Sequence, residues 1–298
     1  MKYISVKQAA ELWSLSERSV RNYCAHWRID GAFLTGKTWN IPENATRPTR
    51  TATAKKAPST LAEILADEMQ SGRKGGIYHK IQVELTYNSN HIEGSRLTAD
   101  QTRYIFETNT IGVLKDETVN VDDIIETSNH FRCIDLIIEN RGKRLSEAFI
   151  KELHRILKSG TSDSRKAWFA VEDYKKQPNE VGGEITTLPR DVHAEMRRLL
   201  SDYENGAPKT LEDIVEFHAR FEKIHPFQDG NGRVGRLIMF KECLRFSVVP
   251  FIIDESIKLL YYNGLKNWDT QHGYLISTCQ LAQDAFREMM GYFKITEV

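Results

Sequence analysis

The chain lacks long apolar runs, paired cysteines and any excess of one charge. Its apolar stretches, such as Ser247 to Ile253, are far too short to cross a membrane, and the N-terminus has no secretory-signal pattern. The four cysteines are widely spaced without a Cys-x-x-Cys pair, which indicates reduced thiols. The 41 basic and 41 acidic residues cancel, so any nucleic-acid surface must be local. We therefore expect a cytoplasmic protein without a membrane partner.

What the chain does contain is the composition of a soluble globular protein. It has 298 residues, 40% of them hydrophobic and 28% charged, enough for one ordinary domain and a smaller one. From Glu43 to Thr60, Thr, Ala, Pro and basic residues follow one another without apolar periodicity. This composition indicates a linker, placed at 47–60, between a module at 1–46 and a domain at 61–298.

The domain at 61–298 is expected to be mostly α-helical. Apolar residues recur there at helical spacing in nine stretches, separated by short polar segments. The exception is Trp168 to Pro189, where aromatic and β-branched residues, two glycines and two prolines favour a short β-hairpin. The predicted fold class is therefore mostly α, with one hairpin in the large domain.

One stretch, HPFQDGNGRVGR from His225 to Arg236, combines residue types suited to phosphate chemistry. A glycine-flanked loop that leads into a helix presents unpaired backbone N–H groups to an anion. Arg233 and Arg236 would share one face at the start of this helix, where a bound polyphosphate would compensate their charge. Asp229 offers a hard oxygen ligand for Mg²⁺, and His225 can act as a general base near neutral pH.

This stretch resembles the HPFx(D/E)GNGRxxR motif of the Fic family and matches it at every specified position. The resemblance extends over roughly Leu61 to Ile295. It implies a mostly helical Fic-type domain and a protein adenylyltransferase, which transfers AMP from ATP to a Ser, Thr or Tyr hydroxyl of a target protein. The protein is also expected to be able to modify its own hydroxyls.

The resemblance also implies a role for each motif residue. His225 would deprotonate the target hydroxyl, Asp229 would bind Mg²⁺, and Arg236 would hold the γ-phosphate. Asn231 with Arg233 and the loop amides would hold the α- and β-phosphates. The residues assigned in this way to the nucleotide are Asp229, Gly230, Asn231, Gly232, Arg233 and Arg236.

Two further segments resemble parts of the family that surround the nucleotide. The hairpin resembles the family's flap, with Val181, Gly182, Gly183 and Glu184 as its candidate contacts, and an exposed strand edge can hold an extended target segment. Tyr261 and Tyr262 resemble residues that line the adenine pocket, although either tyrosine could be a core aromatic. Asp269 stands where many members carry asparagine, which leaves the contact to the adenine edge open.

The stretch SNHIEG, from Ser89 to Gly94, resembles the family's inhibitory motif (S/T)xxxE(G/N). It lies in a helical run near 86–94, ahead of the catalytic motif, as in the subclass with an N-terminal inhibitory segment. Glu93 is expected to pair bidentately with Arg236 and to occupy the partner of the γ-phosphate, which would keep the enzyme off at rest. The alternative is a solvated glutamate at a helix end.

The first 46 residues form a different pattern. Ser5 to Ile29 predicts two short helices, the second N-capped by Ser16, and Gly31 to Pro42 predicts a β-hairpin wing. The pattern resembles excisionase or MerR-type winged helix-turn-helix modules, and the outer side of the second helix would carry Arg18, Arg21 and Asn22. Residues 1–60 contain ten Lys or Arg and four Asp or Glu, a net charge of +6. We expect DNA as the partner, with protein docking as the alternative.

Other functions stay open at this point. The chain could be a DNA-binding transcriptional regulator whose Fic domain senses nucleotide or serves as a scaffold. It could also be a Fic enzyme that removes AMP or transfers another phosphate-containing group. The oligomeric state is open as well. His154, His193 and His218 have no Cys, Asp or His partner at metal-ligand spacing and are expected to be structural.

Overall fold

The computed structural model describes residues 2–48, 58–112, 118–206 and 208–298. These residues fall into two compact units, which divide between Ala57 and Pro58. Residues 49–57 of the predicted linker lie outside the described residues. Within the described ranges, no helix is both long enough and apolar enough to cross a membrane.

The N-terminal unit packs two helices against a small antiparallel sheet. Its elements are β1 (Tyr3–Ser5), α1 (Val6–Trp13), α2 (Glu17–Ala25), β2 (Phe33–Thr35) and β3 (Thr38–Pro42), and the strand order is β1-β3-β2. Ser16 caps α2, as its position predicted, because its side chain accepts the backbone N–H of Ser19. Strand β1 was not predicted, since three residues are too few to show strand periodicity.

The second unit is mostly helical, as predicted, with one small hairpin. Its helices are α3 (Leu61–Ser71), α4 (Ile77–Ile92), α5 (Ala99–Thr108), α6 (Val121–Glu139), α7 (Glu147–Lys158), α8 (Pro189–Glu204), α9 (Leu211–Ile224), α10 (Asn231–Arg245), α11 (Lys258–Lys266) and α12 (Gly273–Tyr292), together with a 3₁₀ turn at Asp163–Arg165. Three of them, α3, α5 and α9, begin at a threonine that forms a capping box. Their starts are therefore fixed by local sequence.

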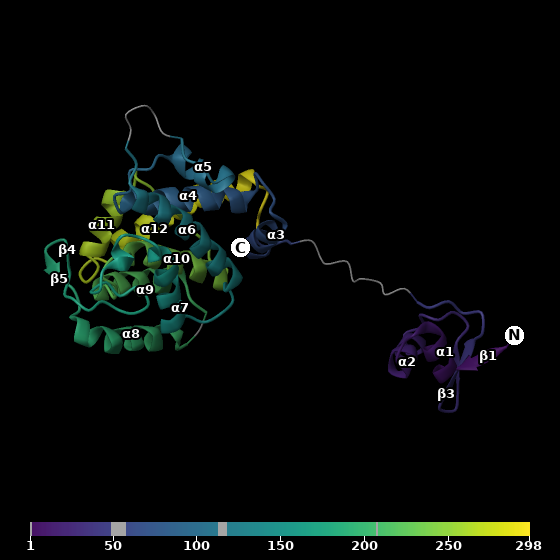
Figure 1. Cartoon of the computed structure of the whole chain (residues 1–298). Coiled ribbons are helices and arrows are strands. Elements are labelled where there is room, and N and C mark those ends of the chain that lie inside the picture. Colours follow the sequence, from purple (N-terminus) through teal and green to yellow (C-terminus); the bar gives the residue numbers. More distant parts are fainter. Residues whose placement is uncertain (1, 49–57, 113–117, 207) are drawn as a thin grey trace. The chain divides into compact units, whose positions relative to one another are not determined.

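Helix α10 lies in the middle of this unit, with α4, α6, α7 and α9 packed around it (Figure 1). Every residue from Asn231 to Leu244 is buried. The helix has no solvent face, so its charged residues must find partners inside the protein. Lys241 and Glu242, for example, pair with each other at 2.7 Å. The start of the motif is consequently held by the core of the unit.

The short hairpin predicted between Trp168 and Pro189 is present. Only β4 (Glu180–Val181) and β5 (Glu184–Ile185) pair, in antiparallel register, and the rest of Trp168 to Pro189 is irregular apart from the first residue of α8. Gly182 and Gly183 make the turn between the strands, both with positive φ, which glycine adopts without a steric penalty. Most aromatic and β-branched residues of this stretch therefore lie in its irregular part.

Candidate active site

The candidate site is the loop from His225 to Gly230, which joins the end of α9 to the start of α10. His225 is the C-cap of α9, in the left-handed conformation with φ 50°. Gly230 is the N-cap of α10, with φ 83°, and no side chain caps this helix start. The first backbone N–H groups of an α-helix have no partner within the helix and carry partial positive charge. This end of α10 can therefore bind an anion.

Side chains from the core hold the loop in place. The Asn231 amide accepts the backbone N–H of Phe227 at 2.8 Å and donates to its carbonyl at 2.9 Å. The Phe227 ring is fully buried and stacks on the His154 ring at 3.9 Å. His154 in turn lies 3.1 Å from the Asp229 carbonyl. Asn231 was assigned to phosphate contact, but its side chain is used on the loop, which leaves its backbone amide for an anion.

His225 is neutral at physiological pH. Burial, and next the positive charge of Lys175, lower the pKa of His225 to about 4. Its Nδ1 atom is buried and makes no hydrogen bond. An unprotonated imidazole is the form that a general base requires. The geometry thus suits the role that the sequence predicted for His225.

Arg236 is bound by the end of α4. Its Nε donates to the Ser89 hydroxyl at 3.0 Å, and its Nη2 donates to the Ser89 carbonyl at 2.9 Å and to Glu93 Oε1 at 2.8 Å. The residue is only 4% exposed, and burial acts to lower the Arg236 pKa, but Glu93 together with Tyr261 holds this pKa above its ordinary value. The bidentate pair expected between Glu93 and Arg236 is not formed: Glu93 accepts one bond and Ser89 accepts two.

The Glu93 carboxylate lies over the first turn of α10. A Cβ atom on Gly232 would be 2.3 Å from Glu93 Oε1 and 2.9 Å from Arg236 Nη1, so only glycine leaves room for both side chains. Glu93 itself is the C-cap of α4 and its side chain is 26% exposed. A carboxylate therefore lies where the sequence predicted a bound polyphosphate.

Asp229 and Arg233 belong to a second cluster of charges. Asp229 Oδ2 accepts bonds from Lys158 at 2.7 Å and from Arg233 at 3.1 Å. Both of these cations also bond to Glu126 on α6. Arg233 and Arg236 were expected to share one face at the start of the helix; both are buried and bind different acids. The charge of Arg233 is therefore already compensated, and Glu126 and Lys158 are site residues that the sequence did not predict.

The donor set fits a Mg²⁺ ion that is shared with phosphate oxygens. Although burial acts to raise it, Arg233 and Lys158 hold the pKa of Asp229 well below its usual range, so the carboxylate is ionised. Its side chain is 45% exposed and can reach a cation. Among the described residues, no group of three or more His, Cys, Asp or Glu could hold a metal alone. Asp229 would therefore have to share the ion with a nucleotide.

Comparisons with known proteins show a similarity to Fic proteins. Residues 144–243 match the Fic/DOC family. The chain is 28% identical to protein adenylyltransferase Fic of Drosophila mojavensis, over 60% of this chain and 35% of that protein, and 27% identical to the Drosophila grimshawi protein, over 60% and 36%. The chain thus spans about a third of the length of these curated relatives.

Solved structures of Fic proteins share the fold. A Fic domain containing signaling protein from Bacteroides thetaiotaomicron is 26% identical, with a TM-score of 0.57, over 78% of this chain and 90% of that chain. Fic-1 from C. elegans has a TM-score of 0.58 at 19% identity, over 77% and 70%, a similarity of fold alone. The mostly helical Fic-type fold is confirmed.

The flap and adenine-pocket candidates that the resemblance implied outside the motif differ from one another in exposure and contacts. Val181, Gly182, Gly183 and Glu184 are all exposed at the hairpin tip. Tyr261 is buried and its hydroxyl lies 2.7 Å from His218 Nε2, so it is a core aromatic. Tyr262 is partly exposed beside the end of α4, with its hydroxyl 3.4 Å from the Ile92 carbonyl. Asp269 forms an exposed ion pair with Lys223.

In the N-terminal unit, the three residues predicted to contact DNA are all exposed on α2: Arg18, Arg21 and Asn22. Arg21 forms an ion pair with Glu17 at 2.7 Å, one turn earlier on the same helix. Surface pairs of this kind are weak, so a phosphate could replace Glu17. Arg18 is the more available of the two cations.

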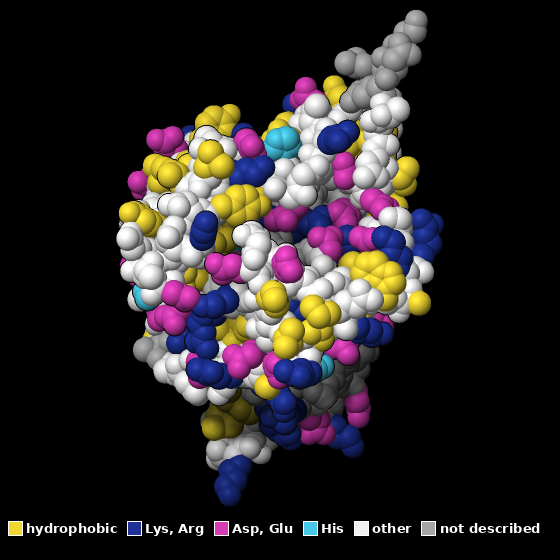
Figure 2. Space-filling view, turned by 90° about the vertical axis from the view of Figure 1, so that its left-hand side faces the viewer, with side chains coloured by type: hydrophobic (Ala, Val, Ile, Leu, Met, Phe, Trp, Pro, Cys, Tyr) yellow, Lys and Arg dark blue, Asp and Glu magenta, His cyan; other side chains and the backbone are white. Residues whose placement is uncertain are grey.

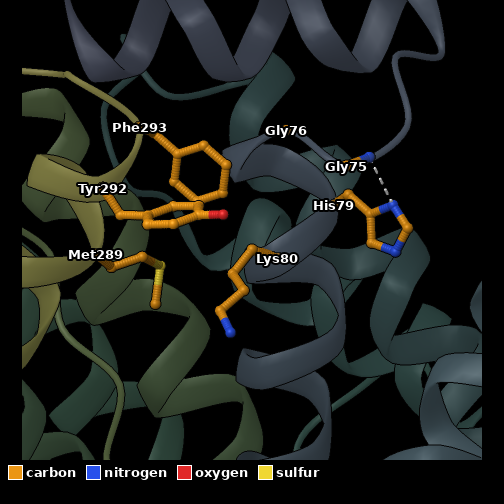
Figure 3. Close-up of a pocket in the computed structure, with 7 residues that line it drawn as sticks. All are labelled: Gly75, Gly76, His79, Lys80, Met289, Tyr292 and Phe293. Carbon is orange, nitrogen blue, oxygen red and sulfur yellow. Dashed lines mark hydrogen bonds between the residues drawn. The ribbon is translucent and has the colours of Figure 1, made fainter.

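A cavity of about 390 Å³ lies at the other end of α4 from Glu93. Figure 3 shows its lining, which comes from Gly75, Gly76, His79 and Lys80 at the start of α4 and from Met289, Tyr292 and Phe293 at the end of α12. Helix α4 has 16 residues, so its two ends are about 24 Å apart. None of the candidate catalytic residues lines this cavity.

Proposed function

We propose that the protein is an adenylyltransferase that transfers AMP from ATP to a Ser, Thr or Tyr hydroxyl of a protein. One observation carries the proposal: neutral His225, ionised Asp229 and buried Arg236 all lie around the uncapped start of α10. On the face shown in Figure 2, Asp and Glu side chains gather around a central hollow, with Lys and Arg among them. The name of the Drosophila relatives supports the same activity.

In the proposed reaction, the target hydroxyl oxygen attacks the α-phosphorus of ATP. The bond from that phosphorus to the β-phosphate oxygen breaks, pyrophosphate leaves, and the hydroxyl proton passes to His225. The N–H groups at the start of α10 and the Arg236 guanidinium would bind phosphate oxygens and stabilise developing charge. Asp229 would hold Mg²⁺, which supplies further charge neutralisation when bound.

We propose further that the described state is the resting, inhibited state. Arg236 is bound to Ser89 and Glu93, and the Glu93 carboxylate lies over the first turn of α10. A γ-phosphate would need the same guanidinium and the same space. ATP could then bind only after Glu93 moves away, or in a position that misplaces the α-phosphate.

Intact-mass measurement tests the proposal. The Glu93→Gly protein, incubated with ATP and Mg²⁺, should gain the mass of one or more AMP groups, on itself or on added acceptor proteins. The matched control is Glu93→Gly combined with His225→Ala, which should gain none while still binding ATP. Gain of another phosphate-containing group would favour the alternative transfer reaction, and loss of AMP from a pre-modified acceptor would favour removal of AMP. No mass change in any of these reactions would refute the proposal.

A second function is proposed for the N-terminal unit, namely binding to duplex DNA. The net charge of +6 over residues 1–60 and the exposure of Arg18, Arg21 and Asn22 on one helix favour it. This DNA binding would not depend on adenylyl transfer, so an experiment can refute one of the two proposed functions and leave the other in place.

A further inference from the structure

Lys175 is a buried cation at the root of the hairpin. It lies between the 3₁₀ turn and β4, and only 3% of the residue is exposed. Its ammonium donates to Asn179 Oδ1 at 2.6 Å, to Thr186 Oγ1 at 2.6 Å and, at 3.4 Å, to the Ile224 carbonyl. All three acceptors are neutral oxygens. Burial accordingly lowers the pKa of Lys175 to about 8.

These contacts join the hairpin to the candidate catalytic loop. Asn179 directly precedes β4 and Thr186 directly follows β5, so the ammonium bridges the two legs of the hairpin. Asn179 also donates to the Phe227 carbonyl at 3.0 Å, and the Lys175 backbone N–H donates to the Pro226 carbonyl at 2.8 Å. Every one of these loop contacts falls within two residues of His225.

A charge is not required for such a connection, because a neutral donor could bridge the same oxygens without the desolvation penalty of an unpaired ammonium. The charge does act on His225, since Lys175 is the second cause, after burial, of its low pKa. The charged groups that act in the opposite sense are Glu93, at the end of α4, and Asp229, in the loop. Glu222, on α9, is protonated at neutral pH because burial raises its pKa to about 8.

We propose that Lys175 is a positioning residue that fixes the hairpin to the catalytic loop and whose positive charge disfavours protonation of His225. The catalytic consequence of this inference rests on the proposed adenylyl transfer. Two of the measurements that test the inference do not. The hairpin would then position the target segment relative to His225, which is unprotonated even in mildly acidic conditions. One side chain would then position the hairpin and add to the effect of burial, which keeps the base unprotonated.

The test uses the full chain with Glu93→Gly, into which Lys175→Met, Lys175→Arg or Lys176→Met is added. Methionine keeps the length of lysine without its charge, arginine keeps the charge, and Lys176 is the adjacent, exposed lysine that serves as control. Two measurements need no activity: the NMR titration of the His225 ring, assigned through His225→Ala, and amide hydrogen exchange of residues 179–186. The third measurement is the rate of AMP transfer against pH.

Lys175→Met should raise the His225 pKa by about one unit, since the positive charge that is the second cause of the low pKa has been removed. The acid limb of the rate profile should move to higher pH by the same amount, and hairpin amides should exchange at least about tenfold faster. Lys175→Arg should leave the titration near that of the parent, and Lys176→Met should change neither measurement. Because removal of an unpaired buried charge relieves desolvation, Lys175→Met is expected to fold.

An unchanged His225 titration in Lys175→Met would overturn the electrostatic half of the proposal, and unchanged exchange would overturn the positional half. Should Lys175→Met fail to fold, Thr186→Val tests the connection alone: it should speed hairpin exchange and leave the His225 titration in place. If the Glu93→Gly parent transfers no AMP, the proposed function fails, while the titration and the exchange still decide the role of Lys175.

Discussion

Graded replacement of Glu93 should activate the protein in the order in which each change weakens its bond to Arg236. That contact is a single hydrogen bond of 2.8 Å between two charged groups, with a donor that is almost fully buried. Hydrogen bonds to charged groups contribute about 1.5 to 3 kcal/mol. At about 1.4 kcal/mol for each factor of ten, Glu93→Gly should raise the rate about tenfold to a hundredfold.

Two intermediate variants sharpen this expectation. Glu93→Gln keeps an acceptor oxygen but loses the charge, so its rate should lie between those of the parent and Glu93→Gly. Ser89→Ala removes one of the two acceptors on Ser89 and leaves the carbonyl, so it should activate only a few-fold. In Glu93→Gly itself, Ser89 still holds Arg236, which therefore stays directed at the start of α10.

The assay is the initial rate of AMP incorporation by intact mass, paired with the melting temperature with and without ATP. Because a ligand present at a hundred times its dissociation constant adds about 2.7 kcal/mol of stability, ATP should raise the Tm of Glu93→Gly more than that of the parent. Adding Arg236→Ala should return both quantities toward the parent. A Glu93→Gly protein no more active than the parent would refute the competition, as would a gain that survives the loss of Arg236.

The remaining predictions concern the metal, the pH dependence and the N-terminal unit. Asp229→Asn should lower transfer at least about tenfold and abolish its dependence on Mg²⁺, measured as rate against Mg²⁺ concentration; full activity in EDTA would exclude the assigned role. Burial raises the pKa of Glu222 to about 8, above its unfolded value of about 4.3, so the folded state holds the extra proton and stability should fall as pH rises through that window. Urea unfolding between pH 5 and 9 should show this fall in the parent and not in Glu222→Gln. The full chain should bind duplex DNA with an affinity that decreases with salt, and Arg18→Ala should reduce the salt slope by about one; binding that is absent at low salt would favour protein docking.

The part of the site that local sequence features could predict is the part that is contiguous, whereas the contact of the distant Glu93 with Arg236 was predicted only from the resemblance to the Fic family. The loop from His225 to Gly230 and the start of α10 could be predicted from local features. One helical pattern ends before the loop, two glycines interrupt the periodicity, and a second helical pattern begins after them. Glu126 lies 107 residues before Arg233, and Lys158 lies 71 residues before Asp229. Only the packing of α6 and α7 against α10 brings them together, and no spacing in the sequence shows that.

Burial on all sides of α10 was equally hidden from the sequence. A helical period with arginines three residues apart predicts that both cations share one face, but it does not show whether that face is buried. In the folded protein that face lies against α4 and α6, and each arginine finds its own acid there. The adjacent tyrosines illustrate the same limit: neighbours on a helix point about 100° apart, so Tyr261 reaches the core and Tyr262 the surface.

The separation of the two arginines makes the proposed inhibition removable at one residue. Glu126 is shared by Lys158 and Arg233 and is largely buried, so its displacement would leave the two buried cations with Asp229 as the one acid that both still share. Glu93 pairs with Arg236 alone and caps the end of α4, next to Gly94 with φ 98°. Helix ends open at low free energy compared with helix interiors. Fraying of the last turn of α4 would therefore free Arg236 and the start of α10 for a polyphosphate, while the cluster around Asp229, the proposed Mg²⁺ ligand, would stay assembled.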